Sequence, residues 1–317
     1  MTGLPRRLAA TTAVCAGLLS LGGCISGSGS GTQSEPQVSE SPVSPTHRPH
    51  QPASGQAPTV SKVLVFVVEN HSLDQMRAQM PYTFSLAERY GYTTSYHALT
   101  HPSLGNYLAI AGGSTFGVVD DNVPTAHPIP GPSVFSQALS AGDTAVTYAE
   151  GMPGNCALDD GGDQYVVRHN PWTYFVGGRA ACDRFDVPGD QLDAAAESGR
   201  LPNVGLVIPN TCNDAHDCAL ATADDWLHKT MEKVFAGPDW RSGHLAIVIT
   251  ADEDDYSADN LVLTTVVDPG LHHVVVDAPL THLSLSGFLS EVVHRPPLRQ
   301  AAHAPSLGEA FGLRVSP

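Results

Sequence analysis

The sequence predicts an α/β protein, a three-layer α/β/α sandwich around a mostly parallel central sheet. Apolar runs such as 60–68 and 244–250 are nearly uninterrupted, as in parallel strands that are buried on both faces. Segments with helical periodicity, of which 220–235 is the clearest, alternate with these runs along the chain. Strands that alternate with helices favour a parallel or mixed sheet that is covered by helices on both sides.

The first 58 residues are predicted to lie outside this fold. Residues 1–23 have a basic start and then an apolar stretch, which is typical of a secretory signal peptide. Leu21-Gly22-Gly23-Cys24 resembles a bacterial lipobox, so we expect Cys24 to carry a lipid; ordinary cleavage beside an incidental cysteine is the alternative. Residues 24–58 are rich in Gly, Ser and Pro, which predicts a disordered linker. The expected product is an extracytoplasmic protein that is anchored to the membrane by lipid.

Residues 59–317, about 259 residues, suit one α/β domain with a large core. In chain order, each expected strand is a short run of apolar residues, and each expected helix repeats apolar residues three or four positions apart. The segment 151–187 has neither pattern and is expected to be a long loop or cap. The expected strands are 60–68, 144–148, 203–208, 244–250, 261–267 and 272–276. The expected helices are 72–80 or 83–90, 103–111, 133–140, 220–235, 282–293 and a short one at 306–311.

The net charge of the chain argues against nucleic acid as a partner. The formal charge is −16, and loss of Arg6 and Arg7 with the signal peptide makes it −18. An acidic surface without a basic patch does not favour nucleic-acid binding, and it also repels other anions. If the substrate is a phosphate ester, a bound cation is therefore expected to reverse the local field.

Four cysteines remain in the predicted folded domain, and an even number in an exported protein indicates disulfides. Three pairings are possible. We expect Cys156–Cys182 and Cys212–Cys218, because this choice closes two local loops. A metal site built from these cysteines is the competing interpretation.

Carboxylates follow two of the expected strands directly. Glu69 and Asn70 come after the first apolar run, and Asp252 and Glu253 come after the run at 244–250. Chemistry in open α/β sheets lies at the carboxyl ends of strands, and neighbouring carboxylates repel one another unless a cation lies between them. A helix cap is the alternative role for Asn70, and a solvated turn is the alternative for the acidic run. The pattern favours a site for Mg²⁺, Ca²⁺ or Mn²⁺.

A serine at the start of the expected helix 103–111 is the candidate nucleophile. Ser103 either caps the helix or reacts, and the helix N–H groups would stabilise an anionic phosphate beside it. Asn106 lies one turn further on and is placed to hydrogen-bond a phosphate oxygen. Carboxylates, a metal and a positioned serine together suggest metal-assisted phosphoryl transfer.

Two further groups of polar residues complete the candidate site. Asp214 and His216 lie in the loop that Cys212 and Cys218 are expected to close, which would hold both side chains rigidly. His273 begins an expected strand. Most of the 15 histidines in the chain must be structural, and histidine ligands would add Zn or Fe to the possible metals.

Taken in order, these segments resemble the phosphoesterase family that holds secreted acid phosphatases and bacterial phospholipases C. That family is similar in fold to the alkaline phosphatase superfamily. The chain has Gly105 where the family usually has Pro, Ala251 where it has an aromatic residue, and His272 where it has Asn. The matching stretches are 67–72, 100–107, 207–210 with 214–218, 250–254, 272–274 and 282–285.

The resemblance implies an alkaline phosphatase-like fold and a role for each site residue. Glu69, Asn70, Asp252 and Glu253 would hold a metal that also touches the nucleophile Ser103. His101 and Asn106 would contact phosphate. Asp214, His216 and His273 would form the second half of the site, as metal ligands or as contacts to phosphate and leaving group.

The predicted function is a metal-dependent phosphomonoesterase that acts through a phosphoseryl intermediate. The Thr100-His101-Pro102-Ser103 form is closer to the acid phosphatase branch than to the phospholipase branch. A phosphodiesterase or phospholipase C is the first alternative. A surface lipoprotein that binds a metal without catalysis is the second.

Overall fold

The computed structural model describes residues 59–316. The predicted signal peptide 1–23, Cys24 and the predicted linker 24–58 lie outside the described residues. Among the described residues, none of the helices has both the length and the apolar character that a membrane span requires.

Eight strands form the central sheet, and their order across it is β5-β4-β6-β1-β7-β8-β2-β9. All neighbouring pairs are parallel except those that involve β8, which is antiparallel to both β7 and β2. β3 and β10 form a separate parallel pair. The strands are β1 Lys62–Val68, β2 Gly91–Thr93, β3 Tyr96–His97, β4 Ala145–Ala149, β5 Asp186–Pro188, β6 Val204–Ile208, β7 Leu245–Ala251, β8 Thr264–Val267, β9 Val274–Val276 and β10 Leu280–Thr281.

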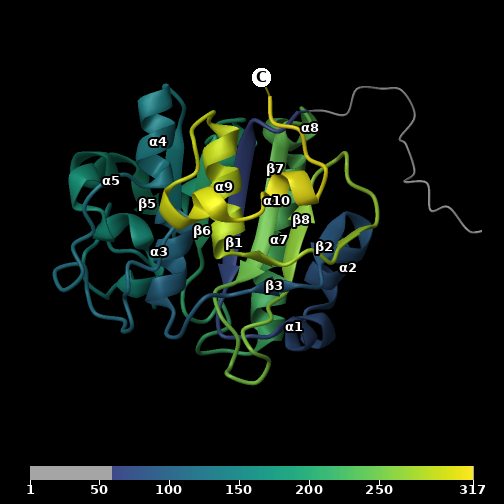
Figure 1. The fold of residues 1–317 in the computed structure, drawn as a ribbon, viewed down its shortest axis with the longest axis horizontal. Helices are drawn as coiled ribbons and strands as arrows, with labels where there is room; N and C mark the ends of the chain where they lie inside the picture. The colour runs from purple at the N-terminus through teal and green to yellow at the C-terminus, as the bar shows by residue number, and fades with distance from the viewer. Residues whose placement is uncertain (1–58, 317) are drawn as a thin grey trace, which may run out of the picture. The chain divides into compact units, whose positions relative to one another are not determined.

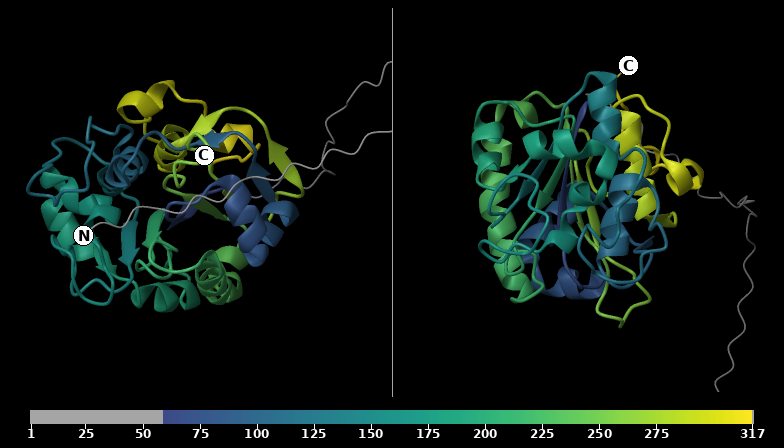
Figure 2. Two further views of the ribbon diagram at one scale, coloured as in Figure 1. Left: turned by 90° about the horizontal axis from the view of Figure 1, so that it is seen from below. Right: turned by 90° about the vertical axis from the view of Figure 1, so that its left-hand side faces the viewer.

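Helices cover both faces of this sheet, so the predicted three-layer sandwich is confirmed (Figures 1 and 2). α3, α4 and α9 lie on one face, and α2, α6 and α7 lie on the other. The helices are α1 Leu73–Gln79, α2 Pro81–Arg89, α3 Leu104–Gly112, α4 Val134–Ala141, α5 Arg179–Phe185, α6 Gln191–Glu197, α7 Leu220–Ala236, α8 Pro238–Arg241, α9 His282–Val292 and α10 Leu307–Ala310, with 3₁₀ turns η1 Val167–His169, η2 Pro171–Tyr174, η3 Val176–Gly178 and η4 Arg299–His303.

Local sequence explains where the main helices begin and end. Ser72, Ser133 and Thr281 are N-caps of α1, α4 and α9, and each forms a capping box with the residue three positions later. α3 ends at Gly113, which has a φ of 68°. A Cβ atom there would lie 2.2 Å from the carbonyl oxygen of Leu298, so only glycine fits at this point.

The two central strands place the site. β1 pairs with β7 in parallel from Lys62 opposite Leu245 to Val68 opposite Ala251, and nearly every residue of both strands is buried. Because the strands run side by side and end at the same level, the residues that follow them, Glu69 and Asp252, are neighbours.

Both expected disulfides are present, Cys156–Cys182 and Cys212–Cys218, so the pairing that closes two local loops is confirmed. The segment 151–187 contains η1, η2, η3 and α5 separated by irregular backbone, which agrees with the expected cap. The strands β2, β3 and β10 were not expected, since two- or three-residue strands are too short to show a period. The helix α6 was not expected either.

Candidate active site

Two buried carboxylates stand at the carboxyl ends of β1 and β7. Glu69 and Asp252 are both fully buried. Oδ1 of Asp252 accepts a hydrogen bond from the backbone N–H of Asn70 at 3.0 Å, and Oδ2 is buried without a hydrogen-bond partner. Burial raises the pKa of Glu69 well above its usual value, and the charges of Asp252 and Asp214 raise it further. Negative charge at this point of the fold is therefore costly unless a cation balances it.

The candidate nucleophile points at this pair. Ser103 immediately precedes α3, and its hydroxyl makes no capping bond to the helix. Instead the Ser103 hydroxyl donates a hydrogen bond to Oε2 of Glu69 at 3.0 Å. The hydroxyl of Tyr107, one turn along α3, donates to Oε1 of Glu69 at 2.5 Å. The helix start thus aims a serine hydroxyl at the carboxylates of the sheet edge.

Asn106 braces the turn that carries the nucleophile. Its side-chain oxygen accepts from the backbone N–H groups of Leu99 and Thr100. Its amide nitrogen donates to the carbonyl oxygen of Thr100 at 2.8 Å and to Oε2 of Glu253 at 3.1 Å. The amide is fully engaged, so the predicted contact to phosphate would have to replace one of these bonds.

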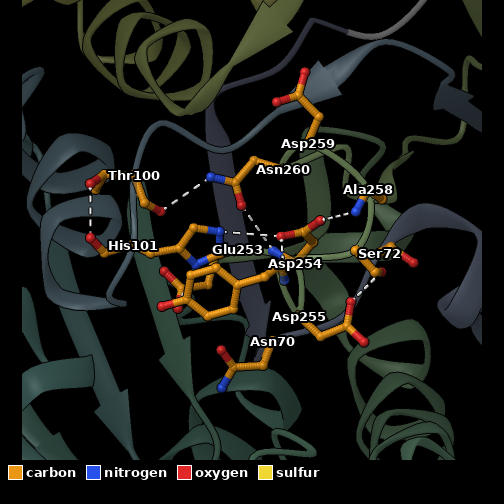
Figure 3. Close-up of polar contacts among 12 residues, drawn as sticks. Asn70, Ser72, Thr100, His101, Glu253, Asp254, Asp255, Ala258, Asp259 and Asn260 are labelled. Atoms are coloured by element: carbon orange, nitrogen blue, oxygen red, sulfur yellow. Dashed lines mark hydrogen bonds and ion pairs between the residues drawn. The ribbon is translucent and has the colours of Figure 1, made fainter.

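His101 lies between two acids of the turn that follows β7 (Figure 3). Its Nδ1 is 3.2 Å from Oε1 of Glu253, its Nε2 is 3.2 Å from Oδ1 of Asp254, and its ring stacks on Tyr256. Burial, followed by the charge of Asp252, raises the pKa of Glu253 to about 9. The structure therefore brings His101, Asn106 and Glu253 together beside Ser103.

A histidine that the sequence analysis missed completes the interior of the site. His169, from η1, is fully buried, with Nε2 3.3 Å from Oε1 of Glu69 and Nδ1 3.2 Å from Oδ2 of Asp214. Neither ring nitrogen has a hydrogen bond of good geometry. Burial lowers the pKa of His169 to about 3 and raises that of Asp214 to about 7. Ligand atoms of Glu69, His169 and Asp214 lie within 4.8 Å of one another.

At the rim of the site, the guanidinium group of Arg168 lies between two polar partners, His216 and Asp121. Arg168 donates from Nη2 to Nε2 of His216 at 3.2 Å, and its Nε lies 3.8 Å from Oδ2 of Asp121. His216 in turn donates from Nδ1 to Asp217 at 2.8 Å, and its backbone N–H binds Asp214. The loop that the second disulfide closes thus brings Asp214 inside and leaves His216 at the edge.

The residues present fit a divalent cation. Oxygen atoms of Asp252 and Asp214 and both ring nitrogens of His169 are buried and lack hydrogen-bond partners, although buried polar atoms in proteins are normally paired. A second group, Cys156, Cys182 and Asp186, also has metal-ligating spacing, but both sulfurs are bonded in a disulfide. The competing prediction of a cysteine metal site is therefore wrong.

Within residues 59–316, His273 is the predicted active-site residue that the structure does not bring to the site. β9 runs parallel to β2, and β2 and β7 are both antiparallel to β8, so β9 points the same way as β7. His273 precedes β9 and therefore lies at the amino end of the strands, opposite to the carboxyl end where the site is. Its side chain is exposed, and Nδ1 bonds the carbonyl oxygen of Glu88 at 2.7 Å. The prediction that His273 joins the site is corrected accordingly.

Several proteins with similar sequences are phosphatases. The family model described as "Phosphoesterase family" matches residues 75–265. Phosphatidylinositol-3-phosphatase of Mycobacterium tuberculosis is 29% identical over 263 residues, which cover 82% of this chain and 86% of that protein. Phosphate-repressible acid phosphatase of Penicillium chrysogenum is 29% identical over 215 residues, which cover 62% of this chain but only 50% of that protein.

A solved structure shares the fold. A protein of the alkaline phosphatase superfamily from Vibrio parahaemolyticus superposes with a TM-score of 0.55 at 11% identity, covering 81% of this chain and 72% of that one. The fold and the relatives define a phosphate-ester hydrolase with an alkaline phosphatase-like architecture. The chain belongs to the Phosphoesterase family.

Proposed function

We propose that this hydrolase is a metal-dependent phosphomonoesterase and that Ser103 forms a phosphoseryl intermediate. The observation that carries the proposal is the hydrogen bond from the Ser103 hydroxyl to Glu69, at the start of a helix and beside the buried Asp252. A serine that served only as a helix cap would turn its oxygen toward the helix N–H groups. This serine is turned toward carboxylates, as a nucleophile that must lose a proton requires.

The reaction takes two displacements at phosphorus. In the first, the Ser103 oxygen bonds to phosphorus, the bond from phosphorus to the ester oxygen breaks, and the alcohol leaves with a proton. Before the reaction, the Ser103 hydroxyl directs the proton that it must lose at Oε2 of Glu69. In the second, water attacks phosphorus, the bond to Ser103 breaks, and inorganic phosphate leaves while Ser103 regains a proton.

Glu69, Asp252 and Glu253, with Asn70 at the same strand end, would hold the cation, and Asp214 and His169 extend the ligand set. When bound, a divalent cation supplies positive charge against the carboxylates and the phosphoryl oxygens. Oxygen ligands favour Mg²⁺, Ca²⁺ or Mn²⁺, and the His169 nitrogens add Zn²⁺ and Fe to the candidates. A backbone N–H at the start of α3 would add a hydrogen-bond donor for the phosphoryl oxygens.

The natural substrate has two candidate classes. A small monoester fits the acid phosphatase relatives, and a phosphoinositide fits the name of the Mycobacterium tuberculosis relative. Lipidation of Cys24, which we propose from the lipobox-like sequence, would place the domain near a lipid surface. A phosphodiesterase or phospholipase C remains the alternative, and activity on bis-esters without activity on monoesters would select it.

The test is hydrolysis of p-nitrophenyl phosphate and bis-p-nitrophenyl phosphate by the purified full-length protein, across a panel of divalent metals. We expect monoester turnover that chelators abolish and added metal restores. Ser103→Ala should reduce kcat by at least about a thousandfold, because the covalent route is lost. Acid quench during turnover should trap phosphate on the peptide that contains Ser103.

Ser85→Ala is the matched control, since this serine lies on α2 and bonds only the carbonyl oxygen of Tyr82. It should leave kcat unchanged. If Ser103→Ala turns over the monoester at the rate of the Ser85→Ala control, the nucleophile is another group and the mechanism fails.

A further inference from the structure

A carboxylate lies where the phosphoryl oxygens of a substrate would be expected. Oδ1 of Asp121 accepts a hydrogen bond from the backbone N–H of Leu104 at 3.0 Å. Leu104 is the first residue of α3 and follows Ser103 directly. Asp121 therefore takes the helix N–H nearest the nucleophile, a donor that suits an anionic oxygen.

The same carboxylate also faces the cation at the rim. Its Oδ2 is 3.8 Å from Nε of Arg168, and Arg168 reaches His216 on its other side. A planar guanidinium with several N–H groups suits phosphate as well as carboxylate. Asp121 thus bridges two donors that are both suited to a phosphate.

Independent features of the same site point to a ligand. Oδ2 of Asp252 and both ring nitrogens of His169 are fully buried and have no hydrogen-bond partner. His169 is the residue after Arg168, and its ring stacks on Tyr107 of α3. Buried polar atoms of Asp252 and His169 therefore lack a partner, whereas the Leu104 N–H is bonded to Asp121 and Arg168 is ion-paired with it.

We propose that Asp121 is an internal competitor for phosphate: the phosphoryl oxygens of the substrate bind the Leu104 N–H and Arg168 in its place. The inference rests on the proposed function, because it assumes that Ser103 is the nucleophile that attacks phosphorus. Asp121 and Arg168 then act in opposite directions on the affinity for anions. Asp121 weakens the binding of phosphate by occupying its donors, and Arg168 strengthens it.

The arrangement gives the site a preference by charge. A phosphomonoester dianion has three non-bridging oxygens and displaces a carboxylate more readily than a diester monoanion with two. We therefore assign Asp121 and Arg168 as specificity-determining residues that favour monoesters over diesters. A diester monoanion displaces Asp121 less readily than a monoester dianion does. Arg168 binds the dianion more tightly because of its second negative charge.

Binding of inorganic phosphate to the metal-loaded full-length protein tests the proposal without turnover. Calorimetry in the Ser103→Ala background would give the affinity even if the proposed nucleophile were wrong. We expect Asp121→Asn to tighten phosphate binding about three- to tenfold, and Arg168→Gln to weaken it about tenfold or more, in line with charge-assisted hydrogen bonds. In the protein with Ser103, Arg168→Gln should also lower the ratio of monoester to diester kcat/KM.

Asp120→Asn is the matched control, since it removes the same charge from the adjacent residue, which pairs with His127 instead. It should leave the phosphate affinity unchanged. Weaker phosphate binding in Asp121→Asn, together with a higher metal concentration for half-activation, would make Asp121 a metal ligand and overturn the proposal. Equal affinities in Asp121→Asn and Asp120→Asn would overturn it as well, while the phosphomonoesterase assignment would stand on the Ser103 experiment alone.

Discussion

The two halves of the site are built differently. Glu69 and Asp252 follow the two central strands, are fully buried, and are fixed by the parallel pairing of β1 with β7. Asp121 and His216 lie in irregular segments and Arg168 lies in the 3₁₀ turn η1, and their side chains are 32%, 31% and 20% exposed, respectively. The first half has a backbone that cannot shift without breaking the sheet. The second half is fixed by side-chain bonds and by one short disulfide loop.

This difference suggests a division of labour. Charges that must be held close together against their repulsion need the rigidity of a sheet edge, because the energy of like charges rises steeply in a buried place. Side chains that choose between substrates can lie on loops, where changes do not disturb the core. Substitutions in the strand half should therefore alter catalysis, and substitutions in the loop half should alter affinity and selectivity.

Among substitutions in the two halves of the site, Asp252→Asn should have the largest effects: it should lower turnover and raise the stability of the metal-free protein. Turnover should fall about a thousandfold, since a metal ligand supplies several kcal/mol and each 1.36 kcal/mol is tenfold in rate. Without metal, the melting temperature should rise, because one of several repelling buried carboxylates becomes neutral. Measurements of kcat and of melting with and without chelator would check both.

Metal addition sharpens the same test. At a metal concentration of 100 times Kd, the wild-type protein should gain about 2.7 kcal/mol, or roughly 5–10 °C in melting temperature. Asp252→Asn should lose most of that gain. Asp255→Asn is the control, since this exposed residue of the same turn bonds Ser257 and Gln75 instead. A full metal-induced shift in Asp252→Asn would remove Asp252 from the ligand set.

Removal of the two disulfides should rank differently for stability and for activity. The Cys156–Cys182 loop spans 26 residues and the Cys212–Cys218 loop spans 6, so chain entropy predicts losses of about 3–4 and about 2 kcal/mol respectively. The short loop carries Asp214 and His216, so removal of the Cys212–Cys218 disulfide should lower kcat/KM about tenfold. Removal of the Cys156–Cys182 disulfide should change kcat/KM by no more than about threefold.

The measurement is melting temperature and steady-state kinetics of the two double Cys→Ser variants side by side. If the long-loop variant loses both more stability and more activity, loop rigidity around Asp214 is not what positions the second half of the site. If the Cys156–Cys182 variant loses more stability and the Cys212–Cys218 variant loses more activity, the long loop serves mainly the fold and the short loop mainly the site.

The strand half could be predicted from the sequence because its signal is local. A run of apolar residues that ends at an acid is typical of a buried strand that delivers a side chain to the sheet edge, and Glu69 and Asp252 both follow such runs. Ser103 was found for a similar reason, since Pro102 and the apolar spacing indicate a helix start. The structure brings all three together.

The loop half could not be predicted in the same way. Asp121 and Arg168-His169 lie in segments without periodicity, and the contacts that give them importance come from residues more than ten positions away. The one available signal was compositional: a charged and polar run, Arg168-His169-Asn170, shortly before the aromatic residues Trp172, Tyr174 and Phe175. A single histidine among 15 gives no further hint until the chain is folded.

His273→Ala should have the smallest effect and tests the geometry most directly. His273 precedes β9, at the amino edge of the sheet, whereas the site lies at the carboxyl edge. We expect kcat/KM within about twofold of wild type, as for a surface substitution away from any site. His169→Gln, which changes the histidine between Glu69 and Asp214, is the matched comparison and should cost about 10- to 100-fold. Comparable losses in both variants would mean that a histidine acts on the site across the whole length of the strands, and the division between the two edges of the sheet would no longer hold.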